Sequence, residues 1–214
     1  GLNTAIEGDS VLVAAGTYVE NITWPAIDGI KLIGENRETT NIDGGTPIDP
    51  NMGSVVVFVN GEDSTTVLSG FTLLNGSGTL GDHMGTGSHH SGGGIFVFNS
   101  SPSITNIIVK ENNITEGAGG GISIIGESIP IINNIVITDN TAGAGGGLLV
   151  WGYVRNNTCI LNASYLTITN NISFTTGGGI FSGYAQCNIN YSTISNNVAS
   201  NRGGGIHIVF SNIS

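Results

Sequence analysis

Five glycine triplets, each followed by Ile or Leu, are the feature that most constrains how this chain can fold. The triplets start 27, 26, 32 and 26 residues apart. A second signal recurs inside the units, where an apolar residue, two polar residues and an Asn follow one another. A fixed period near 26 residues is typical of architectures in which equivalent units stack on one another. The triplet units are Gly92–Ile95, Gly119–Ile122, Gly145–Leu148, Gly177–Ile180 and Gly203–Ile206.

The residues between the glycines read as short strands. They form short runs rich in Ile and Val, separated by Gly, Asn, Ser and Pro, and no stretch keeps a helical period. The consensus of a leucine-rich repeat is absent. Stacking equivalent runs as parallel strands pairs the backbone of each coil with that of the next. We therefore predict an all-β fold, a right-handed parallel β-helix (β-solenoid) with coils of about 26 residues.

We expect one domain over residues 1–214. Residues 1–91 read as irregular N-terminal coils, and residues 92–214 as regular glycine-triplet coils. Leu2–Glu7 is expected to form a short cap over the first coil, because the ends of a solenoid need covering. Gly203–Phe210 begins a fresh coil that the sequence does not complete. We therefore expect a fragment of a longer chain, or an open C-terminal end that stacks on another copy.

Two segments carry a resemblance to a known family. Gly8–Ile22 resembles the opening coil of the pectate-lyase-like superfamily of right-handed parallel β-helix proteins. Leu68–Gly76 and the glycine-triplet units resemble repeats of secreted bacterial and archaeal surface proteins in that superfamily. They are also similar to polymorphic outer-membrane autotransporter repeats, although the aromatic residue of their FxxN motif is mostly Ile here. The resemblance covers essentially the whole chain and implies a fold, but it says little about activity.

Composition limits the classes of partner. Five Lys and Arg against fifteen Asp and Glu give a net charge of −10, so no basic surface is available to neutralise nucleic-acid phosphates. No apolar run approaches the ~20 residues of a membrane span. Nine Asn-x-Ser/Thr sequons fit a secreted or cell-surface protein.

The residues after each triplet predict a buried face and an unusually apolar outer face. Alternate residues of a strand point to opposite sides, and the first and third positions, such as Ile95 and Val97, read as core. The second and fourth positions should then point outward, yet they are also rich in large apolar residues. Such a strip calls for a covering, by a loop of the chain, by a protein partner or neighbouring copy, or by a glycan. With the adjoining insertion, we take as candidate binding residues Phe96, Phe98, Leu149, Trp151, Tyr153 and Phe181.

The recurrent Asn predicts a structural ladder along the solenoid, formed by Asn112, Asn140, Asn171 and Asn197. Glu111 and Asp139 precede two of these residues on adjacent coils and could share a calcium ion. Solvated turn carboxylates are the alternative, because calcium wants six or more oxygen ligands.

A histidine-rich loop and a cysteine pair are two further candidates. Asp82, His83, His89 and His90 form a candidate metal site, and a flexible Gly/Ser loop with incidental histidines is the alternative. Cys159 and Cys187 lie 28 residues apart, two residues out of register on adjoining coils, and we expect a disulfide between them.

The sequence favours a binding module over an enzyme. Lyases of this fold need basic residues in one register and hydrolases need clustered carboxylates, and neither pattern is present. We expect no catalytic residue and no cofactor apart from the calcium alternative. The leading interpretation is a non-catalytic extracellular module for adhesion, surface assembly or glycan contact. A carbohydrate-active β-helix enzyme, a polysaccharide lyase or hydrolase, is the alternative.

Overall fold

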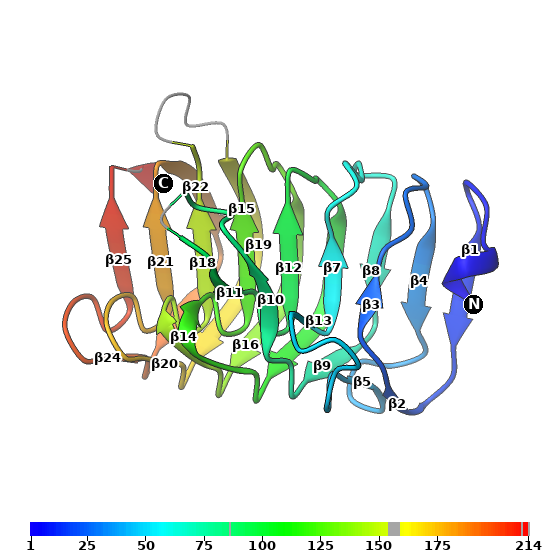
Figure 1. The fold of residues 1–214 in the computed structure, drawn as a ribbon, viewed down its shortest axis with the longest axis horizontal. Coiled ribbons are helices and arrows are strands. Elements are labelled where there is room, and N and C mark those ends of the chain that lie inside the picture. Colours follow the sequence, from blue (N-terminus) through cyan, green and yellow to red (C-terminus); the bar gives the residue numbers. More distant parts are fainter. Residues whose placement is uncertain (86, 154–158, 211, 214) are drawn as a thin grey trace.

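The computed structural model describes residues 1–85, 87–153, 159–210, 212 and 213. Its strands form a right-handed parallel β-helix whose three sheets run along the axis of the solenoid (Figure 1). Consecutive coils repeat every 28, 31 and 26 residues, measured between bonded asparagines of neighbouring coils. The predicted fold class is therefore confirmed, and the coil length varies over about the same range as the spacing of the glycine triplets.

Sheet 1 is the largest of the three sheets and has twelve strands in the part of the chain described. Its longest strands bend at residues with left-handed backbone angles, among them Asn106 and Asn134. The strands are β1 (Ser10–Val13), β2 (Gly16–Val19), β4 (Lys31–Gly34), β5 (Thr40–Asp43), β8 (Val67–Ser69), β9 (Thr72–Leu74), β13 (Ser103–Lys110), β16 (Ile131–Thr138), β19 (Cys159–Thr169), β22 (Ala185–Asn190), β23 (Thr193–Ser195) and β26 (Asn212–Ile213).

Sheets 2 and 3 have seven strands each within the described residues. Sheet 2 contains β3 (Ile22–Thr23), β7 (Val56–Phe58), β12 (Ile95–Phe98), β15 (Ile122–Ile125), β18 (Leu148–Trp151), β21 (Ile180–Gly183) and β25 (Ile206–Val209). Sheet 3 contains β6 (Met52–Gly53), β10 (Gly78–Gly81), β11 (His89–Ser91), β14 (Asn113–Ala118), β17 (Thr141–Ala144), β20 (Ile172–Ser173) and β24 (Val198–Ala199).

Each glycine triplet forms the turn from sheet 3 into sheet 2. Gly145, the first residue of one triplet, has a φ of 60°, which glycine adopts without a steric penalty. At the second position, a Cβ on Gly146 would lie 2.5 Å from the Ile172 carbonyl oxygen and 2.6 Å from that of Gly178. The neighbouring coil therefore leaves no room for a side chain, so the repeat is a requirement of close backbone stacking.

The predicted strand alternation holds in sheet 2. Ile95, Val97 and their equivalents as far as Ile180 face inward and join the main core, whereas Ile206 and Ile208 of the last coil are partly exposed. Leu2, in the short 3₁₀ helix η1 (Leu2–Thr4), packs against the same core at the N-terminal end. No helix among the described residues is long and apolar enough to cross a membrane.

The asparagine ladder crosses the turn from sheet 1 to sheet 3. The Oδ1 of Asn140 accepts hydrogen bonds from the backbone N–H and the side-chain amide of Asn112, at 3.1 and 2.9 Å. The Nδ2 of Asn140 donates to Val109 O at 3.0 Å and to the Oδ1 of Asn171 at 2.9 Å. Asn171 donates to Asn197 in the same way, at 2.9 Å. Each buried amide thus ties its own coil to both neighbours.

Replacing Asn140 with Ala should remove these four bonds and leave buried backbone groups unpaired, which costs about 3 kcal/mol of unfolding free energy. Denaturant unfolding measures the loss. Asn113→Ala, one residue after the ladder and exposed, should cost less than ~0.5 kcal/mol. Equal losses in the two variants would show that the ladder adds nothing to stability.

Candidate functional site

The outward positions of sheet 2 form a second apolar cluster, separate from the main core. Phe96 and Leu149 are fully buried, whereas Phe98, Trp151 and Phe181 are half-buried and Tyr153 is exposed. Phe96 and Leu149, two of the candidate binding residues, are therefore not accessible to a ligand in this structure. The chain itself covers the N-terminal part of the strip, which was one of the three coverings considered.

The covering over Phe96 is the tip of a hairpin whose two strands belong to sheet 3. Strands β10 and β11 pair antiparallel, with Leu80 opposite His90, and Figure 1 shows the hairpin lying across the strands of sheet 2. At its tip the imidazole of His83 packs on the rings of Phe96 and Phe98, with centroids 4.5 and 5.0 Å apart. Met84 packs against the same cluster. The histidine-rich loop thus serves as a lid over the apolar strip.

The four residues of the candidate metal site each have a different setting. Asp82 Oδ1 accepts a bond from the Gly87 N–H at 2.9 Å, and the rings of His89 and His90 contact the carbonyls of Gly87 and Gly78. Among the described residues, no three His, Cys, Asp or Glu side chains gather where they could hold a metal ion. The packing of the lid therefore does not bring the expected ligands together.

Burial lowers the pKa of His83, and the neighbouring His89 lowers it further, while Asp82 acts in the opposite direction. The Nδ1 atom of His83 is buried without a hydrogen-bond partner. The closed lid therefore favours the neutral imidazole, and protonation opposes its packing against the phenyl rings.

The turn backbone covers Leu149, farther along the strip. A Cβ built on Gly119 would lie 3.0 Å from the Cβ of Leu149, and Ala118 and Ala144 belong to the same apolar cluster. Each glycine turn thus carries the end of sheet 3 over the outer side of sheet 2. What remains accessible of the strip lies on the last coils.

Five rings form a continuous aromatic array on these coils. Trp151 contacts Phe181 and Tyr184, with centroids 5.5 and 5.4 Å apart. Phe181 stacks on His207 at 5.4 Å, and Tyr184 stacks on Phe210 at 5.2 Å. Phe210 is 75% exposed, and the other four rings are partly exposed. Offset and edge contacts of this kind are favourable arrangements of aromatic pairs.

Two residues of the array occupy backbone positions that disfavour large side chains. Tyr184 and Phe210 have φ values of 51°, and earlier coils place Asn99 and Gly126 at the equivalent corner. Asn and Gly tolerate the left-handed region, whereas other residues pay about 1–2 kcal/mol there. Such strain collects at functional sites. The replacement of Asn and Gly by aromatic residues therefore marks this corner as a candidate binding site.

The formal charge differs between the N-terminal and C-terminal parts of the chain. All fifteen acidic residues lie between Glu7 and Asp139, and residues 140–214 contain two basic residues, Arg155 and Arg202. Residues 1–139 contain the other three basic residues, so their formal charge is 3 − 15 = −12, against +2 for residues 140–214. The array therefore lies within the longest stretch of sequence that has no acidic side chain. Arg155 lies outside the described residues.

Tyr184, His207 and Phe210 were not among the candidate binding residues predicted from the sequence. His207 is the second residue after its glycine triplet, a position predicted to point outward. Tyr184 and Phe210 are the fifth residues after their triplets, one position beyond the four that were compared. Extending the alignment by one residue would have placed Tyr184 and Phe210 beside Asn99 and Gly126. That contrast in residue type is the signal that could have identified the corner.

The two cysteines are buried free thiols, so the expected disulfide is not formed. Cys159 pairs with Ala185, and Cys187 pairs with Leu161, so the cysteines are diagonal neighbours two residues apart. Strand rise and spacing put diagonal Cα atoms about 8 Å apart, beyond the reach of a disulfide. Burial raises the pKa of both thiols, and that of Cys159 rises to about 12, with the nearby Cys187 adding to the effect.

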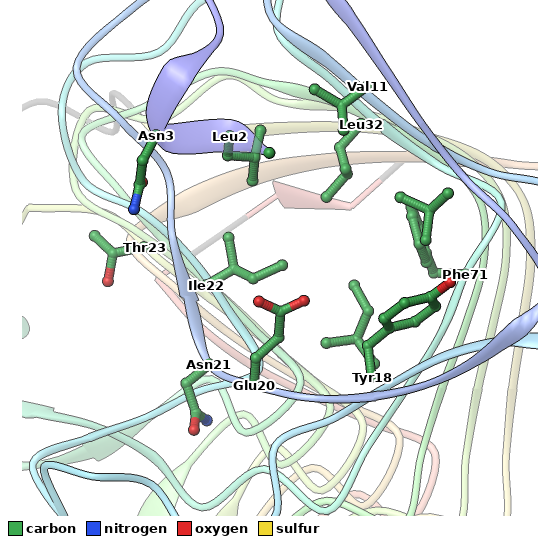
Figure 2. Close-up of a pocket in the computed structure, with 13 residues that line it drawn as sticks. Leu2, Asn3, Val11, Tyr18, Glu20, Asn21, Ile22, Thr23, Leu32 and Phe71 are labelled. Atoms are coloured by element: carbon green, nitrogen blue, oxygen red, sulfur yellow. The ribbon is translucent and has the colours of Figure 1, made fainter.

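The N-terminal end holds two cavities. Figure 2 shows the first, of about 490 Å³, where Leu2 and Val11 face Ile22 and Tyr18 across the interior of the first coil. Glu20 is its only acidic lining residue. The second cavity, of about 370 Å³, lies beside it and is lined by Glu20 and Asp49. The Asp49 carboxylate accepts a bond from the Asn51 N–H at 2.9 Å.

The possible calcium position shows ordinary turn contacts. Glu111 forms an ion pair with Lys110 at 3.2 Å, and Asp139 accepts a bond from Thr138 Oγ1 at 2.7 Å. Both acidic residues have left-handed backbone angles at equivalent turns. Lys110 competes with a cation for the Glu111 carboxylate, so the structure offers no support for calcium there.

The lid should open in acid. Because the pKa of His83 is lowered in the closed state, the unfolded or open state binds protons more strongly, and closure loses stability as pH falls below ~6.5. Binding of a fluorescent hydrophobic dye should rise between pH 7.5 and 5. His83→Phe should abolish most of that rise, and His90→Gln should retain it. An identical rise in His83→Phe would contradict the role of His83.

The thiols should be inaccessible in the native protein. At pH 8 a thiol reagent should react with neither cysteine, because burial excludes the reagent and raises both pKa values. After denaturation without reductant, the same titration should find two thiols. If the titration of the denatured protein found no free thiol, the two cysteines would form a disulfide after all.

Comparisons with known proteins identify no family for this chain. No family model matches the sequence, and no curated protein does. Among solved structures, a pectin methylesterase from carrot is similar with a TM-score of 0.46 and 12% identity, covering 97% of this chain and 82% of that chain.

Proposed function

We propose that this chain is a non-catalytic extracellular module that contacts neutral glycans through the aromatic array. The observation that carries the proposal is the pair of aromatic residues, Tyr184 and Phe210, held in left-handed backbone positions where earlier coils have Asn and Gly. Packing alone does not account for this strain, because Phe210 is 75% exposed. A ligand that uses the rings does account for it.

The chemistry of the array fits a sugar better than a charged ligand. A pyranose presents a face of C–H groups that packs on an aromatic ring, while its hydroxyl groups remain in water. Tyr and Trp combine large apolar rings with one polar group, which suits such a half-wet contact. The sequence around the array has no carboxylate that would bind a cationic ligand, and Arg202 is the only basic residue described there that could bind an anionic one. The proposed ligand is therefore uncharged, and a charged polymer is the comparison in the test.

The shape of the protein fits adhesion or surface assembly. A solenoid presents the same edge on successive coils and so offers an extended surface to a long polymer. The nine sequons are consistent with secretion, which would bring the array into contact with extracellular glycans. Secretion and the adhesive role belong to the proposal together with the ligand.

The test replaces the aromatic residues with the residue found in an earlier coil. Tyr184→Asn with Phe210→Asn should keep the melting temperature within a few degrees, because Asn99 adopts the same backbone region. Binding to cellulose, xylan, mannan or β-glucan, measured by co-sedimentation, should fall at least tenfold. Phe174→Gln removes an exposed ring outside the array and should leave binding unchanged.

Two results would overturn the proposal. The wild-type protein could bind none of these polysaccharides, or the double variant could bind as well as the wild type. A large loss of melting temperature in the double variant, without loss of binding, would return the rings to a structural role. Polygalacturonate, a negatively charged polymer, is included in the same binding assay to compare a charged ligand with the uncharged ones.

A β-helix carbohydrate-active enzyme remains the second candidate, and the cavity lined by Glu20 and Asp49 is the observation that favours it. Two carboxylates on one cavity are the minimum that glycoside hydrolysis needs. Release of new reducing ends or unsaturated products from the same polysaccharides would support it. Glu20→Gln with Asp49→Asn should then abolish the release.

A further inference from the structure

A second pair of aromatic residues occupies strained backbone positions on a different sheet. Tyr165 and Tyr191 have φ values of 58° and 50°, at the bend of sheet 1. Earlier coils place Gly70, Asn106 and Asn134 at this bend, with φ between 54° and 84°. The last coils thus exchange Asn and Gly for tyrosine here, as they do at the corner occupied by the aromatic array.

The two tyrosines form an open stack. Their ring centroids are 5.3 Å apart with an interplanar angle of 15°, and the side chains are 57% and 81% exposed. In the earlier part of the same column the residues are polar, and Arg37 Nη1 donates to the carbonyl oxygen of the exposed Asn134 at 3.3 Å. The tyrosines therefore give the last coils an exposed aromatic surface where the earlier coils present Gly and Asn.

Amide side chains lie on the outer side of sheet 1, along the strands that lead to the two tyrosines. Asn188 Nδ2 donates to Asn162 Oδ1 at 2.9 Å, and Gln186 Nε2 donates to Asn188 Oδ1 at 3.1 Å. Strands β19 and β22 are in register here, so the amides of adjacent coils lie side by side. Sugar hydroxyl groups need neighbouring donors and acceptors of this kind. We call this set, with Tyr165 and Tyr191, the tyrosine–amide face.

Tyr184 of the aromatic array and Tyr191 of this face are seven residues apart along one coil. At the rise of a strand, that separation is roughly 20 Å, more than one sugar unit can span. The array lies on sheet 2 and its corner, and the tyrosine–amide face lies on sheet 1. The aromatic array and the tyrosine pair therefore cannot contact the same sugar unit, and Gln186 lies on the strand between them.

We propose that the tyrosine–amide face is a second contact site for neutral glycans, so that one chain bridges two polysaccharide strands. The inference rests on the proposed function of the array and extends it from binding to cross-linking. The side chains that form the face are aromatic or amide and carry no charge, so an uncharged, hydroxyl-rich polymer is the ligand that they match. Two contacts on one rigid solenoid also increase avidity for a polymer that reaches both.

The experiment measures bridging as well as binding. Wild-type protein bound to an insoluble polysaccharide, such as cellulose, should recruit a fluorescent soluble β-glucan to the pellet. Tyr165→Asn with Tyr191→Asn should reduce recruitment at least tenfold while the protein still binds cellulose through the array. Its melting temperature should be equal to or above the wild-type value, because Asn106 and Asn134 adopt the same backbone.

Matched variants separate this inference from the proposed function. The array variant, Tyr184→Asn with Phe210→Asn, should lose recruitment too, and Phe174→Gln should recruit as the wild type does. The proteins are made in a bacterial host that does not glycosylate Asn, because Tyr165→Asn and Tyr191→Asn each create an Asn-x-Thr sequon. Tyr165→Gly with Tyr191→Gly, which introduces the residue type of Gly70 at the same bend, replaces the Asn pair if that variant misfolds.

Unchanged recruitment by the folded tyrosine variant would overturn the second site and leave the array as the single contact. Wild-type binding without recruitment would overturn bridging in the same way. Absence of any polysaccharide binding by the wild type would overturn the proposed function together with this inference. Light scattering measures the molar mass of each protein and so shows whether it is a monomer. Recruitment by a monomer requires two sites on one chain.

Discussion

Parallel stacking in register is the constraint on which the rest of this structure depends. Coils pair strand to strand, and every residue has its equivalent as a neighbour about 4.8 Å away along the axis. A side chain that clashes with its own copy cannot occupy such a column. The glycine columns follow from that rule, and so does the asparagine column, because a stacked amide both donates to and accepts from its own kind.

Much of the fold could be predicted from the sequence, because the constraint repeats. The glycine triplet and the inward columns that follow it appear five times, and the ladder asparagine appears four times. Each copy supports the same interpretation. The sequence also predicted a short N-terminal cap, and in the structure Leu2 of the 3₁₀ helix packs against the core at that end. Features present in every coil are visible in a single sequence without any comparison to relatives.

The features that occur once were harder to predict. The loop of the β10–β11 hairpin covers Phe96, and among the described strands only β10 pairs antiparallel, with β11 and β6, so the periodicity gave no indication of it. The cysteine pair was expected to bridge, although a shift of two residues places the thiols too far apart. The aromatic corner was missed because the alignment stopped at the end of the strand, one residue before Tyr184.

The asparagine ladder also determines how the solenoid would respond to a pulling force. Each ladder amide bonds to the coil on either side, and the strand hydrogen bonds run in the same direction, from coil to coil. A load applied along the axis therefore peels one coil from the next. A coil of 28 residues releases roughly 90–100 Å of extended chain when it detaches. Such a chain would lengthen in steps under tension and dissipate energy with each coil, while the remaining coils keep their shape.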